Sequence, residues 1–293
     1  MNQSYSKKLF RAGIAGLLFL LGSMGVQAQT YADEISLAFD YMKQNRLDSA
    51  ERAFKAALKS EPDNPLNPFL LNNLGTIQRR LGKRDQALLS YTAALGTFPK
   101  QLVFLESRAS LFAEMGQAEN AIIDYSALLT EAPNNEEALY QRGLLYLQVK
   151  NTDLSEIDFR QMLKLNPNSL YARIGFASLA KFRGDYEEAE KIYNYLLDKE
   201  PENSSLYAGR AELYLLMNRP GKSSSDINRA IRLAGDSVTE PYLYIIRYRA
   251  KLLLHETAGA QNDLKKAISL GYKEEAPAAK DPLATEASPA PFE

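Results

Sequence analysis

The chain has 293 residues, of which 45% are hydrophobic and 24% are charged, an ordinary globular composition whose length alone suggests about two domains. Lys and Arg total 35 against 36 Asp and Glu, so no strong net charge attracts nucleic acid, and we expect no nucleic-acid partner. There is no cysteine and one histidine, His255, which excludes disulfides, thiol nucleophiles and cysteine zinc sites. We therefore expect no metal, no cofactor and no enzymatic activity.

The first 28 residues have the pattern of an export signal. Three cations precede an apolar stretch at 12–26, which is shorter than the span of about 20 residues that a membrane helix needs. The stretch ends in Val26-Gln27-Ala28, with small residues where a signal peptidase reads the chain, so we expect cleavage before Gln29. An uncleaved anchor is the alternative. We expect an exported protein, in a bacterial periplasm, at the outer membrane or secreted, with no transmembrane segment after cleavage.

The remainder of the chain repeats itself. Prolines end successive apolar stretches at spacings of 34 residues, with one spacing of 37: Pro62, Pro99, Pro133, Pro167 and Pro201. Twelve positions before each proline lies a small residue: Ala50, Ala87, Ala121, Ser155 and Ala189. Eight positions before it lies an aromatic residue: Phe54, Tyr91, Tyr125, Phe159 and Tyr193. Residues four apart share one helical face, and upstream residues that accept left-handed geometry separate this helix from an earlier one: Asn45, Gly82, Gly116 and Gly184.

This pattern resembles the tetratricopeptide repeat family, whose unit is a helix-turn-helix of 34 residues. The resemblance implies an all-α fold, a right-handed superhelical solenoid of about seven units over residues 29–272. The units begin near Tyr31, Pro68, Leu102, Glu136, Leu170, Ser204 and Pro241. The last two units depart from the pattern, with Gly235 and Tyr272 where the proline belongs.

Residues 273–293 differ in composition from the repeats. They are rich in alanine, proline and acidic residues, and they lack the apolar period of an amphipathic helix. Such a segment buries too little apolar surface to offset its ordering entropy. We expect a disordered acidic tail, with a folded terminal cap as the alternative.

Arginine and aspartate occur together in four units. Arginine replaces the usual apolar residue of the first helix at Arg108, Arg142, Arg210 and Arg247, and the same units carry Asp124, Asp158, Asp226 and Asp263 in the second helix. The other three units carry neither. Pairing each aspartate with the following unit would leave Asp158 facing Phe176, so we predict ion pairs within units. The alternative is that the arginines line a groove and bind an anionic partner.

The family resemblance also implies a binding surface, because the first helices of such units line the concave face. The residues that it places there are Phe69, Asn72, Thr76, Arg79, Glu106, Tyr140, Leu144, Tyr171, Ile174, Ser178, Tyr242 and Arg249. This mixture of aromatic, aliphatic and polar groups suits a protein or peptide partner. An equally weighted alternative is that the aromatic residues fill gaps between units.

No motif points to catalysis. Gly221-Lys222-Ser223 resembles the end of a phosphate-binding loop, but Leu216 stands where that loop needs a glycine. We therefore expect an exported scaffold for protein binding through the concave surface. One alternative is a structural subunit of a cell-envelope complex that uses convex or edge contacts. A minor alternative, an envelope hydrolase, would need a cleft with a perturbed carboxylate pair.

Overall fold

The structure is a computed structural model that describes residues 26–235 and 240–272. Most of the expected signal segment and the whole expected tail lie outside these residues. The expected cleavage site before Gln29 falls in the first turn of the first described helix. The described residues form fourteen α-helices: α2 (Val26–Lys43), α3 (Leu47–Ser60), α4 (Asn67–Arg80), α5 (Arg84–Thr97), α6 (Leu102–Glu114), α7 (Ala118–Glu131), α8 (Glu136–Gln148), α9 (Thr152–Leu165), α10 (Leu170–Arg183), α11 (Tyr186–Lys199), α12 (Ser204–Leu216), α13 (Pro220–Ala234), α14 (Pro241–Leu253) and α15 (Thr257–Ser269).

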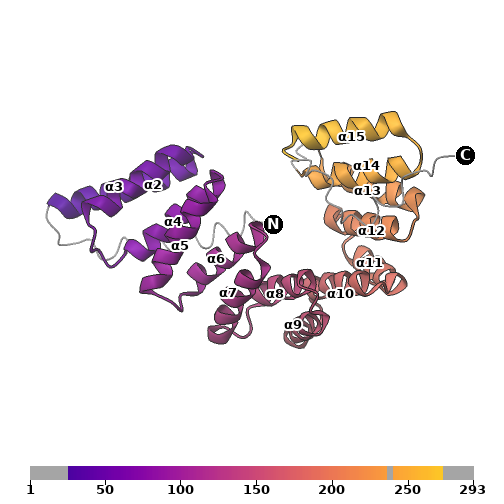
Figure 1. Cartoon of the computed structure of the whole chain (residues 1–293), viewed down its shortest axis with the longest axis horizontal. Coiled ribbons are helices and arrows are strands. Elements are labelled where there is room, and N and C mark those ends of the chain that lie inside the picture. Colours follow the sequence, from indigo (N-terminus) through magenta and orange to yellow (C-terminus); the bar gives the residue numbers. More distant parts are fainter. Residues whose placement is uncertain (1–25, 236–239, 273–293) are drawn as a thin grey trace, which may run out of the picture. The chain divides into compact units, whose positions relative to one another are not determined.

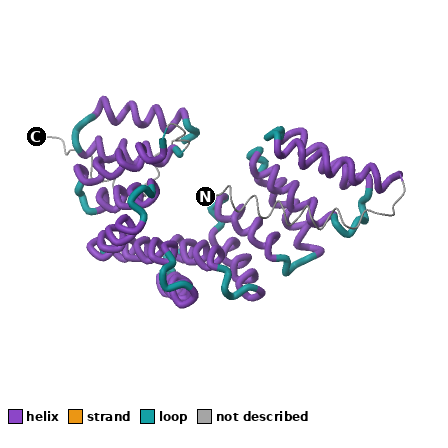
Figure 2. The backbone as a smooth tube through the Cα atoms, turned by 180° about the vertical axis from the view of Figure 1, so that it is seen from behind, coloured by secondary structure: helices purple, strands orange, loops and turns teal. Residues whose placement is uncertain are grey.

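The helices pack as seven consecutive pairs, α2 with α3 through to α14 with α15 (Figure 1). We call each pair a repeat, and number the repeats 1 to 7 in chain order. Short loops join the helices, and the described residues contain no strand (Figure 2). The fold is thus the all-α solenoid architecture that the sequence predicts, with a first and a second helix in every repeat.

One residue in the left-handed region ends the first helix of every repeat. Four of these turn residues were anticipated by their type, Asn45, Gly82, Gly116 and Gly184, with φ between 58° and 82°. The other three are Lys150, Asn218 and His255, with φ of 61°, 49° and 60°. His255 is exposed, and its left-handed backbone conformation forms the turn between α14 and α15.

The small and aromatic positions determine how closely the paired helices approach. A Cβ atom on Gly75 would lie 2.7 Å from the Cε1 atom of Tyr91, and one on Gly143 would lie 2.5 Å from the Cε1 atom of Phe159. Both aromatic side chains are fully buried. At these two glycines the ring of the second helix packs directly on the backbone of the first helix, so a Cβ atom fits only if the ring shifts.

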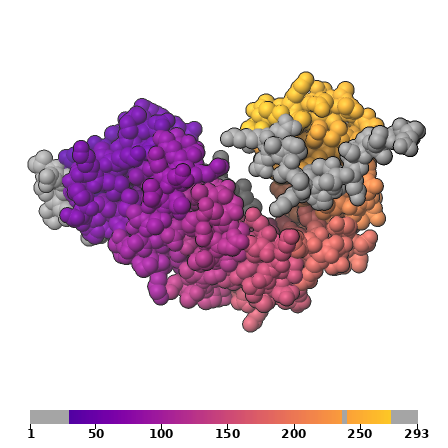
Figure 3. Space-filling view, viewed as in Figure 1, coloured from indigo at the N-terminus to yellow at the C-terminus, as the bar shows by residue number. Residues whose placement is uncertain are grey.

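The helices form two compact units that divide after Leu165. The N-terminal unit contains α2 to α9, whose side chains pack into one body (indigo to magenta in Figure 3). The C-terminal unit contains α10 to α15 and has its own buried clusters, one around Tyr193 and Leu206 and another around Ile227 and Leu243. Repeats 1 to 4 therefore share one unit and repeats 5 to 7 the other.

Candidate interaction surface

The residues expected on the concave face lie on first helices of both units. Those in the N-terminal unit are on α4, α6 and α8, and those in the C-terminal unit are on α10 and α14. Tyr242 is 43% exposed and Asn72 is 8% exposed, whereas the rest of the predicted set is half-buried. A surface of this kind is accessible to a partner, yet its side chains are held in place by their neighbours.

Two of the predicted aromatic residues contact other rings of the array. The ring centroid of Phe69 lies 5.9 Å from that of Phe98 and 5.2 Å from that of Phe104, which belongs to the following repeat. The ring of Tyr140 lies 6.3 Å from that of Phe159 within its own repeat. Phe69 therefore packs against rings of repeats 2 and 3 and stays half-buried.

Two cations of the first helices, Arg79 and Lys181, are paired with acids on the next first helix. Arg79 on α4 donates from Nε to Glu114 on α6 at 2.8 Å. Burial alone would lower the pKa of Arg79, but the hydrogen bond and the charge of Glu114 outweigh it and raise that pKa. Lys181 on α10 forms an equivalent bridge to Glu212 on α12 in the C-terminal unit. Each bridge ties two consecutive first helices together and neutralises the cation.

Hydroxyl groups link the first helices to the aromatic rings of the second helices. Thr76 lies 3.1 Å from the hydroxyl oxygen of Tyr91, and Ser110 lies 3.1 Å from that of Tyr125. Burial, more than the nearby carboxylates, raises the pKa of Tyr125 to about 12. These tyrosines therefore stay neutral and present hydrogen-bonding groups to the first-helix face.

One buried acceptor on a first helix of the N-terminal unit lacks a hydrogen-bond partner among the described residues. The buried Oδ1 atom of Asn72 has no hydrogen-bond partner among the described residues. On the next first helix, burial raises the pKa of Glu106, and the negative charge of Glu137 adds to the effect. Asn72, Glu106 and Tyr140 occupy the same register in repeats 2, 3 and 4, 34 residues apart. We call these three residues the acceptor row, after the carboxamide and carboxylate oxygens and the hydroxyl oxygen that they carry.

Each of the four arginines forms a bidentate bond with the aspartate of its own repeat. The nitrogen–oxygen distances run from 2.6 to 3.0 Å, from Nε and Nη2 to the two carboxylate oxygens. The aspartate side chains are 3 to 10% exposed and the arginine side chains 18 to 22%. The guanidinium group thus bridges the first and second helices of one repeat.

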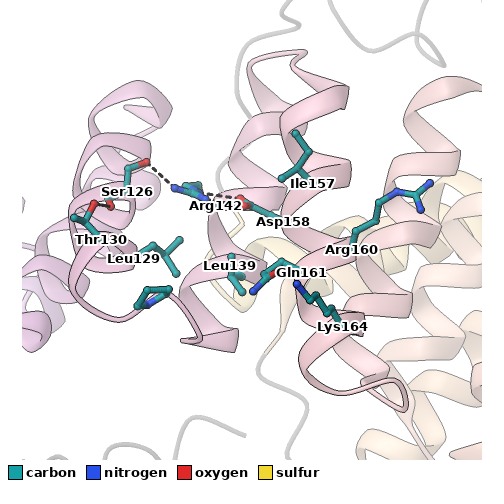
Figure 4. A pocket seen from close by; sticks show the side chains of 11 residues that line it. Ser126, Leu129, Thr130, Leu139, Arg142, Ile157, Asp158, Arg160, Gln161 and Lys164 are labelled. Carbon is teal, nitrogen blue, oxygen red and sulfur yellow. Dashed lines mark hydrogen bonds and ion pairs between the residues drawn. The ribbon is translucent and has the colours of Figure 1, made fainter.

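The third guanidinium nitrogen reaches the preceding repeat, a contact that sequence reasoning missed. Arg142 Nη1 donates to Ser126 Oγ at 3.0 Å while its other nitrogens hold Asp158 (Figure 4). The other acceptors are Thr92 for Arg108, Asn194 for Arg210 and Asn228 for Arg247. All four acceptors directly follow the aromatic or aliphatic position of a second helix, so the spacing was visible in the sequence. We call each arginine with its two partners a clamp.

None of the described helices combines the length and apolar character needed to cross a membrane. Within residues 26–235 and 240–272, no group of three or more acidic or histidine side chains is placed to hold a metal ion.

The comparisons with known proteins agree with this architecture. A family model of the tetratricopeptide repeat matches residues 35–101, 72–136 and 174–237, and a second such model matches residues 136–169. The crystal structure of a tetratricopeptide repeat protein from Parabacteroides merdae is 45% identical, with a TM-score of 0.78 over 84% of this chain and 95% of that one.

More distant structures share the fold alone. The Pseudomonas aeruginosa protein pilF is 18% identical, with a TM-score of 0.53 over 73% of this chain and 96% of that one. PilW, described as a widely conserved type IV pilus biogenesis factor, is 16% identical, with a TM-score of 0.55 over 72% of this chain and 96% of its own. The repeated helix pairs, the family matches and the similarity to the Parabacteroides protein together show that this chain belongs to the tetratricopeptide repeat family, whose members are scaffolds for protein–protein interaction.

Proposed function

We propose that this chain is an exported scaffold that binds a protein or peptide partner along the faces of its first helices. The observation that carries the proposal is the acceptor row of Asn72, Glu106 and Tyr140, one residue from each of three consecutive first helices. Their common register presents one residue per repeat to a ligand that runs across the helices. A peptide, which offers a backbone amide at every residue, has the repeating character that such a row needs.

The chemistry of the row favours a ligand that donates hydrogen bonds. Leaving the Oδ1 atom of Asn72 buried without a donor costs about 1 to 3 kcal/mol, which a bound N–H group would recover if the side chain rotated to meet it. Glu106 supplies a half-buried carboxylate beside it in the array, and its raised pKa reflects poor solvation of the charge. Amide and cationic groups of a peptide satisfy both acceptors.

The proposal can be tested by placing a photo-crosslinking amino acid at single positions in the native host. Tyr140 reports on the acceptor row, and the exposed Arg229 on the second helix α13 serves as the control. We expect a specific adduct from position 140, absent from position 229 and lost when Asn72→Leu is added. Adducts of equal yield at both positions, or from position 229 alone, would contradict binding along the first helices.

Export is the second part of this proposal, and it is supported by the cationic and apolar pattern that ends at Ala28. We expect the protein purified from its host to begin at Gln29 and to fractionate with the periplasm or the outer membrane. Mass spectrometry of the intact protein measures this directly. A chain that retains residues 1–28 in the cytoplasm would contradict it.

A second candidate function is a structural subunit of an envelope assembly that uses the outer faces of the second helices. Exposed aliphatic residues on α5, α7 and α9 favour this candidate. In the crosslinking experiment it predicts adducts from second-helix positions of the N-terminal unit, such as Gln86, and none from position 140. This outcome would replace binding along the first helices with the assembly role.

A further inference from the structure

An exposed aliphatic residue occurs at the same register in three consecutive repeats of the N-terminal unit. Leu89 on α5 is 72% exposed, Ile123 on α7 is 63% exposed and Ile157 on α9 is 58% exposed, and they are 34 residues apart. We call these three residues the aliphatic row. The equivalent exposed positions of the other four repeats are all polar: Arg52, Lys191, Ser225 and Asn262.

The surroundings of the row also suit contact with another helix layer. Each of the three residues lies near the middle of a helix of 14 residues, where a crossing or antiparallel helix makes its closest approach. One turn further along, α5 and α7 expose only the small side chains of Ala93 and Ala127. The outer face of these helices therefore carries protruding aliphatic side chains, with space next to them on α5 and α7 for the side chains of another helix.

A pocket adjoins the row between α7 and α9. Its volume is about 550 Å³, and its lining includes the apolar side chains of Leu129, Leu139 and Ile157. Figure 4 shows these residues around the Arg142 and Asp158 clamp, with Lys164 on the α9 side. Apolar groups of an incoming surface can enter here, which extends the contact beyond the aliphatic row.

The charges beside the row indicate which kind of surface fits. Each of the three helices carries an acid in its first turn, Asp85, Glu119 and Asp153. Cations lie beyond the row, towards the end of α9, at Arg160 and Lys164. A copy of the same face, turned so that its helices run antiparallel, places the acidic start of α9 over the end of α9 that carries these cations, whereas α5 and α7 have no basic residue in their last turn. A parallel arrangement would place acids over acids, which costs energy.

We infer that the outer face of α5, α7 and α9 is a self-association surface, on which a second copy of this chain docks with its helices antiparallel. The two-fold axis runs along the aliphatic row, so that Ile123 packs against Ile123 of the other copy at the centre. Burial of the row against itself removes exposed aliphatic surface from water in both copies. This surface is separate from the first-helix faces proposed to bind a partner.

The oligomeric state of the full chain tests the inference. Sedimentation equilibrium over a concentration series should show a dimer, and Ile123→Asp should abolish it. The matched control is Ile268→Asp, because Ile268 is 47% exposed on α15, outside the row. A monomeric wild type throughout the series, or an equal effect of both variants, would overturn the inference.

The absence of cysteine allows a second measurement that does not depend on the aspartate variant folding. Under mild oxidation, Ile123→Cys should form a disulfide-linked dimer and Ile268→Cys should not, because a disulfide requires Cα atoms within about 7 Å. Antiparallel pairing also predicts a crosslink in a mixture of Glu119→Cys and Ala127→Cys, which lie four residues to either side of Ile123. Efficient crosslinking of Glu119→Cys with itself would overturn the antiparallel arrangement, and failure of Ile123→Cys to link would overturn the docking surface.

Discussion

Repeats with the arginine clamp and repeats without it join their first and second helices through different kinds of contact. In repeat 4, Arg142 joins its own two helices through Asp158 and also binds Ser126 of the preceding repeat. In repeat 2 the equivalent positions hold the buried Leu74 and Ser90, and Ser90 donates a hydrogen bond of 2.7 Å to Gln78. Within these repeats, the arginine position and the aspartate position are therefore either both charged and paired with each other, or both uncharged.

The clamp positions must change together because burial penalises a lone charge. Burial raises the pKa of Asp158 more than the hydrogen bonds and charge of Arg142 lower it. The ion pair thus contributes little net stability compared with an apolar pair, whereas the loss of one partner strands a buried charge. This difference explains how repeats with and without the clamp coexist in one array.

The largest expected effect comes from removing one side of a clamp. Arg142→Ala leaves the Asp158 carboxylate, which is 3% exposed, without its guanidinium partner. We expect the free energy of unfolding to fall by about 3 to 5 kcal/mol, measured by urea denaturation. The control is Arg160→Ala, whose side chain is 70% exposed beside Glu156 and whose loss should cost about 0 to 1 kcal/mol. Equal losses for the two variants would refute the clamp as a buried unit.

A smaller effect should be common to both kinds of repeat. Gly75 lies in a repeat without a clamp and Gly143 in one with it, and a Cβ atom at either would overlap an aromatic ring. We expect alanine at each position to lower the free energy of unfolding by about 1 to 3 kcal/mol. Gly96→Ala, where nothing lies within 4 Å, should instead gain about 0.5 to 1 kcal/mol. A loss at Gly143 but none at Gly75 would show that the close approach depends on the clamp.

The boundary between repeats 1 and 2 lacks a clamp and carries an ion contact of another kind. Burial alone would raise the pKa of Glu51, but hydrogen bonds from Lys55 and Lys83, with their charges, lower it to about 2. Because the pKa in the folded state lies below the unfolded value, this stabilisation is present above about pH 4.5 and is lost as the pH falls towards 2.

We therefore expect Glu51→Gln to lower the free energy of unfolding by about 1 to 2 kcal/mol near neutral pH, a value reduced for solvent screening of the lysines. The difference from the wild type should shrink when denaturation is repeated between about pH 6 and about pH 3. A difference that stays constant over this range would contradict the role of the ionised carboxylate.

Much of the fold could be predicted because the same small, aromatic and turn positions recur in successive repeats. The small and aromatic positions gave the helix pairs, and Gly82, Gly116 and Gly184 marked the turns. Lys150 was missed as a turn residue, since nothing in its type indicates positive φ. The division after Leu165 was not predicted either, because periodicity describes the repeats and not how the interfaces between them differ.

The candidate surface was less predictable than the fold. Register placed Phe69 and Asn72 on a first helix, but not the ring contacts of Phe69 or the unpartnered oxygen of Asn72. Burial of an individual atom depends on rotamers and on neighbours from other repeats. The bond from Arg142 to Ser126 was missed for a different reason, since only aspartates were considered as partners of the arginines.

The coupling between the two helices of a repeat is measured most directly by a double-mutant cycle across one clamp. The free energy of unfolding is determined for the wild type, Arg142→Ala, Asp158→Ala and the double variant. If the two positions act as one unit, the double variant loses much less than the sum of the single losses, with a coupling of about 2 kcal/mol or more. Losses that add to within about 0.5 kcal/mol would show that Arg142 and Asp158 act independently and would contradict the clamp.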